Sequence, residues 1–277
     1  LFDHDYAYIF QNPDKRIIFA IPYEGEFTLI GTTDVEHDGA IGAARIDASE
    51  TSYLCEQASR YFERAVAPAD VVWSYSGVRP LLDDESGDPS AVTRDYSLEL
   101  DTSSAPLLSV WGGKITTFRK LAEEAADLLT APLGTTRGAW TAGQTLPGGD
   151  LASKASTELM ADFERCVDAL RERHPELPAP LCRRLARGYG SRADGLLSQG
   201  LGTEVAPGLF EAELHYLHRH EWARSADDVL WRRTKLGLHL TLTERASVEA
   251  WCRANWGDVA ATATTSHAAS ALEPSWN

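Results

Sequence analysis

The segment Trp111–Thr117 (WGGKITT) places a glycine pair, a lysine and two threonines directly after an apolar run. Two adjacent glycines let backbone N–H groups approach a ligand, because no Cβ stands in the way. A helix that begins near Thr116 would add the positive end of its dipole. We interpret the segment as a platform for an anion or a cofactor, with an ordinary strand-to-helix turn as the alternative. Its residues are Gly112, Gly113, Lys114, Thr116 and Thr117. The P-loop spacing is absent from it, and the pattern G-x-G-x-x-G occurs nowhere in the sequence.

Basic residues are scarce in the first half of the chain, where residues 1–130 carry 23 acidic and only 10 basic side chains. Arg79 ends an apolar run, Arg94 precedes another, and Lys114 lies in the glycine turn. Arginine suits two-point recognition of a phosphate or carboxylate, and lysine supplies a point charge. We predict that Arg79, Arg94 and Lys114 bind an anionic small molecule. The alternative for both arginines is a structural ion pair with Asp83, Asp84, Glu85 or Asp95.

Two other polar clusters favour structural roles. Gly31–Asp34 (GTTD) is typical of a turn that is closed by side-chain hydrogen bonds. A metal site is conceivable at His215, His218, His220 and Glu221, because these residue types ligate metals. Only two of these histidines share a helical face, and no H-E-x-x-H pattern is present, so we predict no metal.

The composition indicates a globular protein rather than a disordered, membrane-spanning or nucleic-acid-binding one. Hydrophobic residues make up 43% of the 277 residues, and the formal net charge is -15. Phosphate neutralisation needs clustered Lys and Arg, so we expect no nucleic-acid partner. No apolar run is long enough to span a bilayer. The four cysteines are far apart without a C-x-x-C pair, which fits reduced thiols in the cytoplasm.

The spacing of apolar residues predicts an α+β front part with a mostly antiparallel sheet. We expect strands at 6–11, 16–22, 27–33, 71–78, 96–100 and 107–111. Helices are expected from a cap at Ser49 to Ala65, and from Thr116 to Leu129. These elements make residues 1–130 one portion of the chain, in which the strand before Gly112 and the helix after it position the predicted platform.

The second part of the sequence predicts helices only. Residues 131–150 are rich in Gly and Pro, as a linker is, and 258–277 are expected to form a flexible tail. Between them, 151–257 predict an all-α domain. The expected helices are 151–174, 180–189, 193–197, 210–220, 225–236 and 243–256.

Several strings resemble the FAD-dependent (aerobic, respiratory) glycerol-3-phosphate dehydrogenase family. In the first half they are Phe27–Asp34 (FTLIGTTD), Trp73–Leu81 (WSYSGVRPL), Asp83–Ser86, Thr93–Tyr96 and Gly112–Leu121 (GGKITTFRKL). In the second half they are Tyr189–Ser191, Glu211–Leu214, Glu221–Trp222, Ala226–Asp228 and Leu230–Lys235 (LWRRTK). The resemblance runs in order from about residue 6 to 255 and identifies the chain as a C-terminal half of such a flavoprotein.

The resemblance implies an FAD/NAD(P)-binding flavoprotein fold that here lacks its N-terminal Rossmann segment. The implied reaction oxidises sn-glycerol 3-phosphate to dihydroxyacetone phosphate by hydride transfer to FAD, and electrons continue to quinone. It implies substrate binding by Arg79, Arg94 and Lys114, and flavin contacts from Gly112–Thr117, whereas upstream catalytic residues lie outside the chain. The implied location is cytoplasmic, peripheral at the inner face of the cytoplasmic membrane, with a homodimer as a further expectation.

Two alternatives stay open at this point. A glycerol-3-phosphate oxidase of the same fold would pass its electrons to O2, and nothing in this sequence separates it from the dehydrogenase. A non-catalytic interaction or dimerisation module is a function of a different class. Because the dinucleotide fingerprint is absent, we expect the chain alone to be inactive and to hold FAD poorly.

Overall fold

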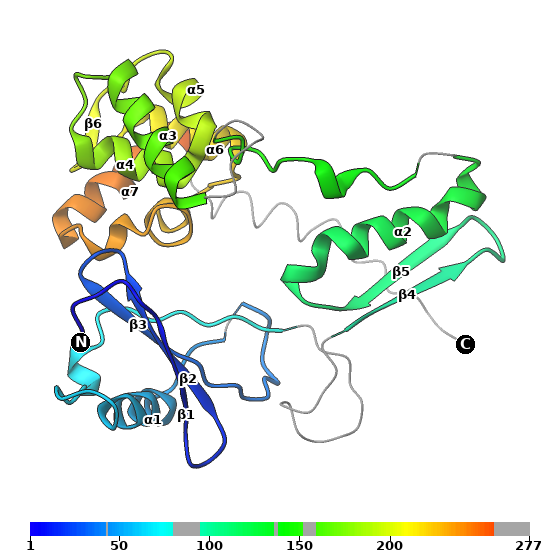
Figure 1. Ribbon diagram of the computed structural model, residues 1–277, viewed down its shortest axis with the longest axis horizontal. Coiled ribbons are helices and arrows are strands. Elements are labelled where there is room, and N and C mark those ends of the chain that lie inside the picture. Colours follow the sequence, from blue (N-terminus) through cyan, green and yellow to red (C-terminus); the bar gives the residue numbers. More distant parts are fainter. Residues whose placement is uncertain (43, 80–94, 136–137, 152–158, 258–277) are drawn as a thin grey trace. The chain divides into compact units, whose positions relative to one another are not determined.

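The structure is a computed structural model that describes residues 1–277 except 43, 80–94, 136–137, 152–158 and 258–277. It divides into two compact units, Leu1–Gln144 and Thr145–Asn277, which are described separately below (Figure 1). The boundary between them falls inside the Gly- and Pro-rich segment 131–150. The predicted tail 258–277 lies outside the described residues.

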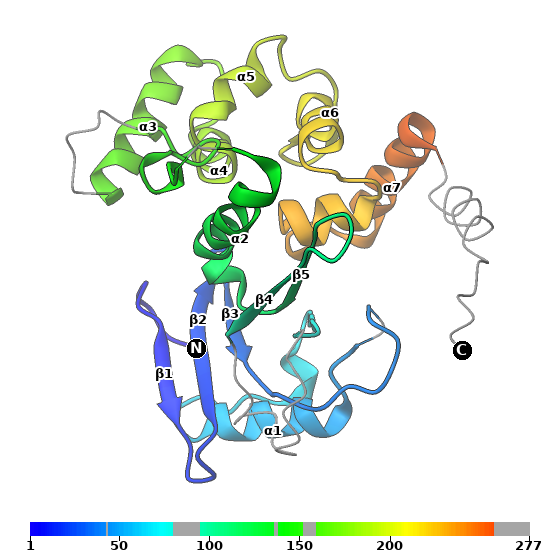
Figure 2. The same cartoon turned by 90° about the vertical axis from the view of Figure 1, so that its right-hand side faces the viewer.

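The first unit opens with a three-stranded antiparallel sheet of β1 (Tyr8–Gln11), β2 (Ile17–Tyr23) and β3 (Phe27–Gly31). A tight turn joins the first two strands, and the Asn12 amide donates to the Arg16 carbonyl at 2.8 Å. The helix α1 (Ala48–Ser59) packs on this sheet, with Ile18 buried against Leu54 and Ala58 (Figure 2). The core of the sheet therefore lies under α1.

The start of α1 is fixed by Asp47, not by Ser49 as the sequence pattern predicted. The Asp47 carboxylate accepts from the Glu50 amide at 2.8 Å, and the Glu50 side chain accepts from the Asp47 amide at 3.1 Å. This reciprocal capping box satisfies two N–H groups that the helix itself leaves without partners. Ser49 instead donates its hydroxyl to the same aspartate at 2.8 Å.

The second group of elements in the first unit is a hairpin followed by a helix. β4 (Tyr96–Asp101) pairs antiparallel with β5 (Leu107–Gly112), with Tyr96 opposite Gly112. A 3-10 turn at Ile115–Thr117 (η2) leads into α2 (Phe118–Leu133), which contacts β4. The helix is longer at its end than predicted, because Gly134 at φ +63° is the residue that closes it.

The predicted strand 71–78 is wrong: no strand is present between the 3-10 turn Pro68–Asp70 (η1) and Arg79. Val72 is 69% exposed and Tyr75 is 60% exposed. Alternating apolar residues favour a strand only where a neighbouring strand and a core receive them, and neither is present here among the described residues.

The second unit is built on helices around one core. They are α3 (Leu159–Arg173), α4 (Ala179–Tyr189), η4 (Gly190–Arg192), α5 (Ala193–Leu197), α6 (Glu211–His220) and α7 (Leu242–Trp256). The all-α prediction needs one correction, because β6 (Glu204–Ala206) and β7 (Leu209–Phe210) form a two-stranded antiparallel pair. Pairs this short are set by tertiary contacts rather than by sequence periodicity.

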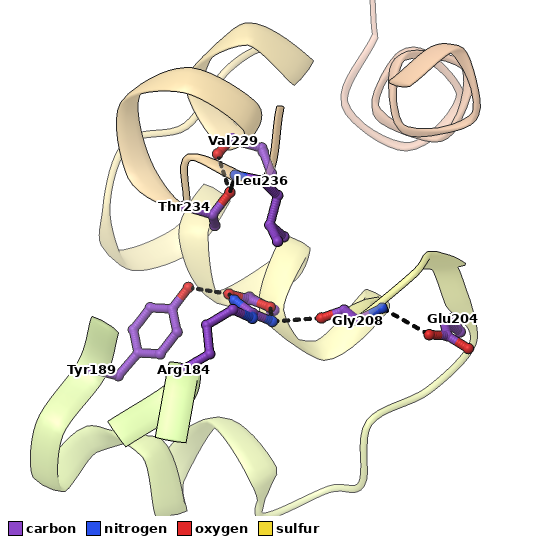
Figure 3. A network of polar contacts seen from close by, with 8 residues as sticks. Arg184, Tyr189, Glu204, Gly208, Val229, Thr234 and Leu236 are labelled. Carbon is purple, nitrogen blue, oxygen red and sulfur yellow. Dashed lines mark hydrogen bonds and ion pairs between the residues drawn. The ribbon is translucent and has the colours of Figure 1, made fainter. Parts of the chain in front are cut away.

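The predicted helix 225–236 is confirmed in part, because residues 226–233 are helical, but most of it is a π-helix that ends before Leu236. The structure has a π-helical turn at Asp228–Arg233 (η5) and a 3-10 turn at Leu236–Leu238 (η6). The Thr234 hydroxyl donates to the Val229 carbonyl at 2.7 Å and accepts from the Leu236 amide at 3.2 Å (Figure 3). A side chain that bonds the backbone in this way competes with a regular helix.

A buried ion pair with a tyrosine lies in the core of the second unit (Figure 3). Arg184 donates to both carboxylate oxygens of Glu213 at 2.6 Å, and the Tyr189 hydroxyl donates to the same carboxylate at 2.6 Å. Glu213 is 1% exposed. Burial, together with the charge of Glu213, raises the pKa of Tyr189, which keeps the phenol protonated as a donor. The network joins α4 to α6. Replacing only Arg184 or only Glu213 by an apolar side chain would leave an uncompensated charge in the core, which is strongly destabilising.

The described part of the chain is thus a mixed fold of helices and three small sheets, with no closed barrel. None of its helices has the length and apolar character needed to cross a bilayer.

Candidate functional site

The glycine turn connects β5 to α2 with a backbone that glycine adopts readily. Gly112 has φ +65° and Gly113 has φ +94°. A Cβ on Gly113 would lie 3.1 Å from the Cβ of Tyr96 on the paired strand. The Tyr96 hydroxyl in turn donates to Glu124 on α2 at 2.7 Å, and this bond raises the pKa of Tyr96. The turn is therefore held close to β4, and Gly113 is required both for its dihedral angle and for space.

Backbone donors are available in this turn. The Thr117 amide and hydroxyl both donate to the Lys114 carbonyl, at 3.0 and 2.8 Å. The amides of Lys114, Ile115 and Thr116 have no acceptor among the described residues. Thr117, at the N-cap position of α2, makes no side-chain cap. The first turn of the helix thus leaves N–H groups for an external acceptor, as anion sites at helix N-termini do.

The surroundings of the turn are apolar and open. Lys114 is exposed, and its ammonium group has no partner among the described residues. Ile115 is 86% exposed, Phe118 52% and Trp111 49%. A cation and open amides beside exposed apolar side chains suit a flat ligand that carries negative charge.

Arg79 is placed against Asp34, a partner that the sequence analysis missed. Its Nη1 donates to Asp34 Oδ2 at 2.6 Å, and the two side chains are 44% and 38% exposed. The candidates Asp83, Asp84 and Glu85 lie outside the described residues, as does the predicted site residue Arg94. No second acceptor contacts Arg79 among the described residues, so its other N–H groups stay available.

Asp34 belongs to the GTTD segment, which connects three parts of the first unit. The segment follows β3 directly. The Thr33 hydroxyl donates to Glu50, a residue of the α1 capping box, at 2.5 Å. Asp34 then accepts from Arg79. In the sequence, Asp34 comes directly after the end of a strand and two threonines. We interpreted this pattern as a turn and did not identify Asp34 as the partner of Arg79.

The structure does not bring all predicted site residues together. No hydrogen bond or ion pair joins Arg79 to Lys114 or to the glycine turn within the described ranges. The two groups are therefore two separate candidate elements of the first unit.

The histidines of the second unit are used in packing. His215 meets Trp251 edge to face at 5.2 Å, and His218 stacks on Trp256 at 4.6 Å. His220 lies against Tyr216 at 4.8 Å. No group of three metal-ligating side chains is present among the residues that the structure describes.

Comparison with known families divides the chain much as the structure does. Residues 2–119 match the family model described as FAD dependent oxidoreductase. Residues 139–253 match the model described as C-terminal domain of alpha-glycerophosphate oxidase. The first match ends just after the glycine turn, and the second covers the helical unit.

Curated relatives agree with these matches. The aerobic glycerol-3-phosphate dehydrogenase of Escherichia coli strain K12 is 46% identical over 252 residues, which are 88% of this chain and 49% of that protein. The D-erythritol 1-phosphate dehydrogenase of Brucella abortus strain 2308 is 45% identical over 251 residues, with the same coverage. The glycerol-3-phosphate dehydrogenase of Pseudomonas aeruginosa is 45% identical over 252 residues, 88% of this chain and 48% of that protein.

The chain spans about half the length of these relatives. Both family models, the helical second unit and the glycine turn of the first unit lead to one assignment. The chain belongs to the FAD-dependent glycerol-3-phosphate dehydrogenase family, whose cofactor is FAD.

Proposed function

We propose that this chain forms the substrate- and flavin-facing part of an enzyme that oxidises sn-glycerol 3-phosphate to dihydroxyacetone phosphate. The observation that carries the proposal is the turn at Gly112–Thr117, with open amides and an exposed lysine at the start of α2. It lies inside the segment that matches the FAD dependent oxidoreductase family.

The residues of the turn fit a flavin. Bound FAD would accept the two electrons and the hydrogen removed from C2 of the substrate. The amides of Lys114, Ile115 and Thr116 point their N–H dipoles from a helix N-terminus, where negative charge is stabilised. Gly113 keeps this backbone close to β4, because a Cβ there would meet Tyr96. Exposed Ile115 and Phe118 supply apolar contact beside it.

The phosphate of the substrate needs cations, and Arg79 is the best-placed one in the described ranges. Asp34 holds one nitrogen of its guanidinium and leaves the others for phosphate oxygens. Lys114 and Arg94 complete the proposed set, and Arg94 lies outside the described residues. Because two of the relatives act on glycerol 3-phosphate and one on D-erythritol 1-phosphate, by their names, a phosphorylated polyol is the substrate class we expect.

The electron acceptor that we propose is quinone, and the protein would then act peripherally at the inner face of the cytoplasmic membrane. O2 is the alternative acceptor, supported by the match of 139–253 to a domain of alpha-glycerophosphate oxidase. A homodimer is a further proposal. The non-catalytic reading loses support because the flavin-facing turn retains its donors.

A pair of variants tests the flavin site, measured on the FAD-loaded protein. Gly113→Val is expected to lower FAD content and the flavin midpoint potential, since its side chain collides with Tyr96 and shifts the turn away from the ring. Lys114→Met is expected to keep the fold and lower the midpoint potential, because the reduced flavin loses a nearby cation. Lys120→Met on α2 is the matched control, since Lys120 pairs with Glu123 on the helix surface. Unchanged potential and FAD content in both test variants would exclude the turn from the flavin site.

A further inference from the structure

The second unit contains a pocket of about 520 Å³ where α4 ends and η4 begins. This volume lies in the range of small-molecule sites. Its walls include Phe163, Tyr189 and Tyr216, and its charged lining comprises Arg187, Arg192, His220 and Glu221. None of these residues belongs to the flavin- or substrate-facing elements of the first unit.

Two glycines shape one wall of the pocket. The Ser191 amide donates to the Gly148 carbonyl at 3.1 Å, which ties the segment before Leu151 to the corner after α4. Gly148 has φ +85° and Gly190 has φ +55°. A Cβ on Gly190 would lie 1.9 Å from the Gly148 carbonyl oxygen. The two backbones therefore meet without side chains between them, and the hollow beside them is a built feature of the corner.

The arginines of the pocket make no hydrogen bond or ion pair within the described ranges, unlike their neighbours. Arg183 makes a two-point ion pair with Glu164, and Arg173 makes one with Asp194. Arg187 and Arg192 make no hydrogen bond or ion pair among the described residues, although the Arg192 charge favours the ionised forms of Asp150 and Glu221 from a longer distance. Two arginines from either side of Tyr189-Gly190 thus bring unpaired guanidinium groups to one hollow. That arrangement suits a phosphate, which each fork can bind at two points.

Aromatic rings form the rest of the lining. Tyr189 and Tyr216 meet edge to face at 5.1 Å, and Tyr216 lies against His220 at 4.8 Å. Tyr189 is held in place by its hydrogen bond to Glu213. Such a row offers a ring face or edge to a flat heterocycle.

Glu221 adds a hydrogen-bonding group of the opposite charge. Its carboxylate has no hydrogen-bond partner among the described residues. Burial raises the pKa of Glu221, while the nearby charges of Arg233 and Arg192 oppose that rise. Arg233 itself donates to the Glu221 backbone carbonyl at 2.9 Å. A carboxyl group here can pair with the N–H groups of a heterocycle while the arginines hold its phosphate.

We propose that this pocket binds a nucleoside monophosphate. Arg187 and Arg192 bind the phosphate, the Tyr216–His220 pair contacts the base, and Glu221 bonds its polar edge. All residues of this site belong to the second unit, and none of them belongs to the elements proposed for the oxidation.

Calorimetric titration of the purified full chain with AMP tests the proposal. We expect one saturable site per chain. Arg187→Gln and Arg192→Gln should each weaken AMP binding at least tenfold, while the fold, followed by circular dichroism and Tm, stays unchanged because neither arginine has a partner to lose. Arg219→Gln is the matched control, an exposed arginine of α6 that is also without a partner in the described ranges but does not line the pocket. Its affinity for AMP should equal that of the unmodified chain.

Adenosine and inorganic phosphate separate the two halves of the ligand. Both should bind more weakly than AMP, and phosphate should compete with it. The proposal is overturned if folded chain shows no saturable AMP binding, or if adenosine binds as tightly as AMP. It is also overturned if AMP affinity persists in the Arg187 and Arg192 variants, since AMP then binds elsewhere, for example where FAD binds.

Discussion

Arg79 illustrates how a single ion pair can serve structure, binding or both. Its partner Asp34 is half exposed, as Arg79 is, so solvent screens the pair. Exposed pairs of this kind contribute about 0–1 kcal/mol to stability. A pair with so little effect on folding is nevertheless able to orient a guanidinium group for a phosphate. The two roles therefore differ in which measurement a substitution changes.

We expect Arg79→Ala to weaken transition-state binding, measured through kcat/KM for glycerol 3-phosphate, by about 2–5 kcal/mol in the FAD-loaded enzyme. Loss of a charge from a phosphate contact has an effect of this size. The free energy of unfolding should fall by less than about 1 kcal/mol. Asp34→Asn removes the same ion pair but keeps the cation, so it should retain most of the activity. If Arg79→Ala and Asp34→Asn have equal kinetics, Arg79 is only a structural partner.

The buried network of Arg184, Tyr189 and Glu213 allows a second test at this scale. Tyr189→Phe removes one hydrogen bond to a buried carboxylate and should lower the free energy of unfolding by about 1.5–3 kcal/mol. Tyr216→Phe is the control, because its hydroxyl has no partner within the described ranges and little loss is expected. Urea unfolding followed by circular dichroism measures both. Equal losses in the two variants would contradict the network's role.

The sequence indicated the types of the site residues better than their partners. The predicted turn lies at a strand end before a helix, as expected, and contains Gly112, Gly113 and Lys114. This local order could be predicted because it depends only on residues adjacent in sequence. The Arg79–Asp34 pair joins positions 45 apart in sequence. Nothing in the composition of either neighbourhood specifies such a pairing, which depends on how β3 and the segment before Arg79 come together.

The turn between β5 and α2 depends on glycine more than the turn that ends α2 does. Gly113 combines φ +94° with a close neighbour in Tyr96, whereas Gly134 closes α2 at φ +63° with open space around it. Alanine at Gly113 or at Gly134 would have to adopt a positive φ, which is unfavourable for a residue with a Cβ. Only alanine at Gly113 would also displace a neighbour, Tyr96.

Gly113→Ala should therefore lower the free energy of unfolding by at least about 1 kcal/mol more than Gly134→Ala. Thermal and urea unfolding of the full chain provide the comparison. Losses of the same size in the two variants would mean that the turn relaxes freely, and the account of a backbone held against Tyr96 would fail.

The sequence predicted helices and strands correctly where the apolar residues of a segment followed a single helical or strand spacing and a cap or turn marked its end. The hairpins and the helix Ala193–Leu197 follow their apolar spacing. The prediction failed at 71–78, where alternation is present but nothing buries the apolar side chains. At 225–236 it was right that the segment is helical but wrong about its form and its end, because the segment is mostly a π-helix and the Thr234 hydroxyl bonds the Val229 carbonyl where it stops. Side-chain bonds to the backbone are local, but their geometry is not encoded in periodicity.

The whole molecule has two units of unequal core size. In the first unit the buried cluster is Ile18, Leu54 and Ala58 with partly buried neighbours, and many large apolar side chains are exposed. The core of the second unit draws on all its helices. Since buried apolar area is the main stabilising contribution, the second unit should be the more stable.

Cysteine alkylation is expected to report this difference. Cys55 is buried in the first unit, and Cys182 and Cys252 are buried in the second. Burial raises the pKa of Cys252 to about 12, so its thiol should react only after unfolding. With iodoacetamide pulses at increasing urea, read by peptide mass spectrometry, Cys55 should label at lower urea than Cys182 and Cys252. Labelling of all three at one urea concentration would indicate a single cooperative unit.

We propose that this chain supplies the substrate- and flavin-facing part of an enzyme that oxidises glycerol 3-phosphate. Because the chain spans about half of its relatives, the test co-expresses it with the part of the Escherichia coli relative that it does not match. The chain alone should purify without stoichiometric FAD, since it contains no dinucleotide fingerprint.

The most direct measurement is anaerobic reduction of the flavin in that complex by glycerol 3-phosphate, followed by flavin absorbance. We predict FAD binding and stoichiometric bleaching by glycerol 3-phosphate, slowed by Arg79→Ala and unaffected by Lys120→Met. Re-oxidation with a quinone analogue or with O2 then identifies the acceptor. A complex that binds FAD but is not reduced by glycerol 3-phosphate would contradict the account.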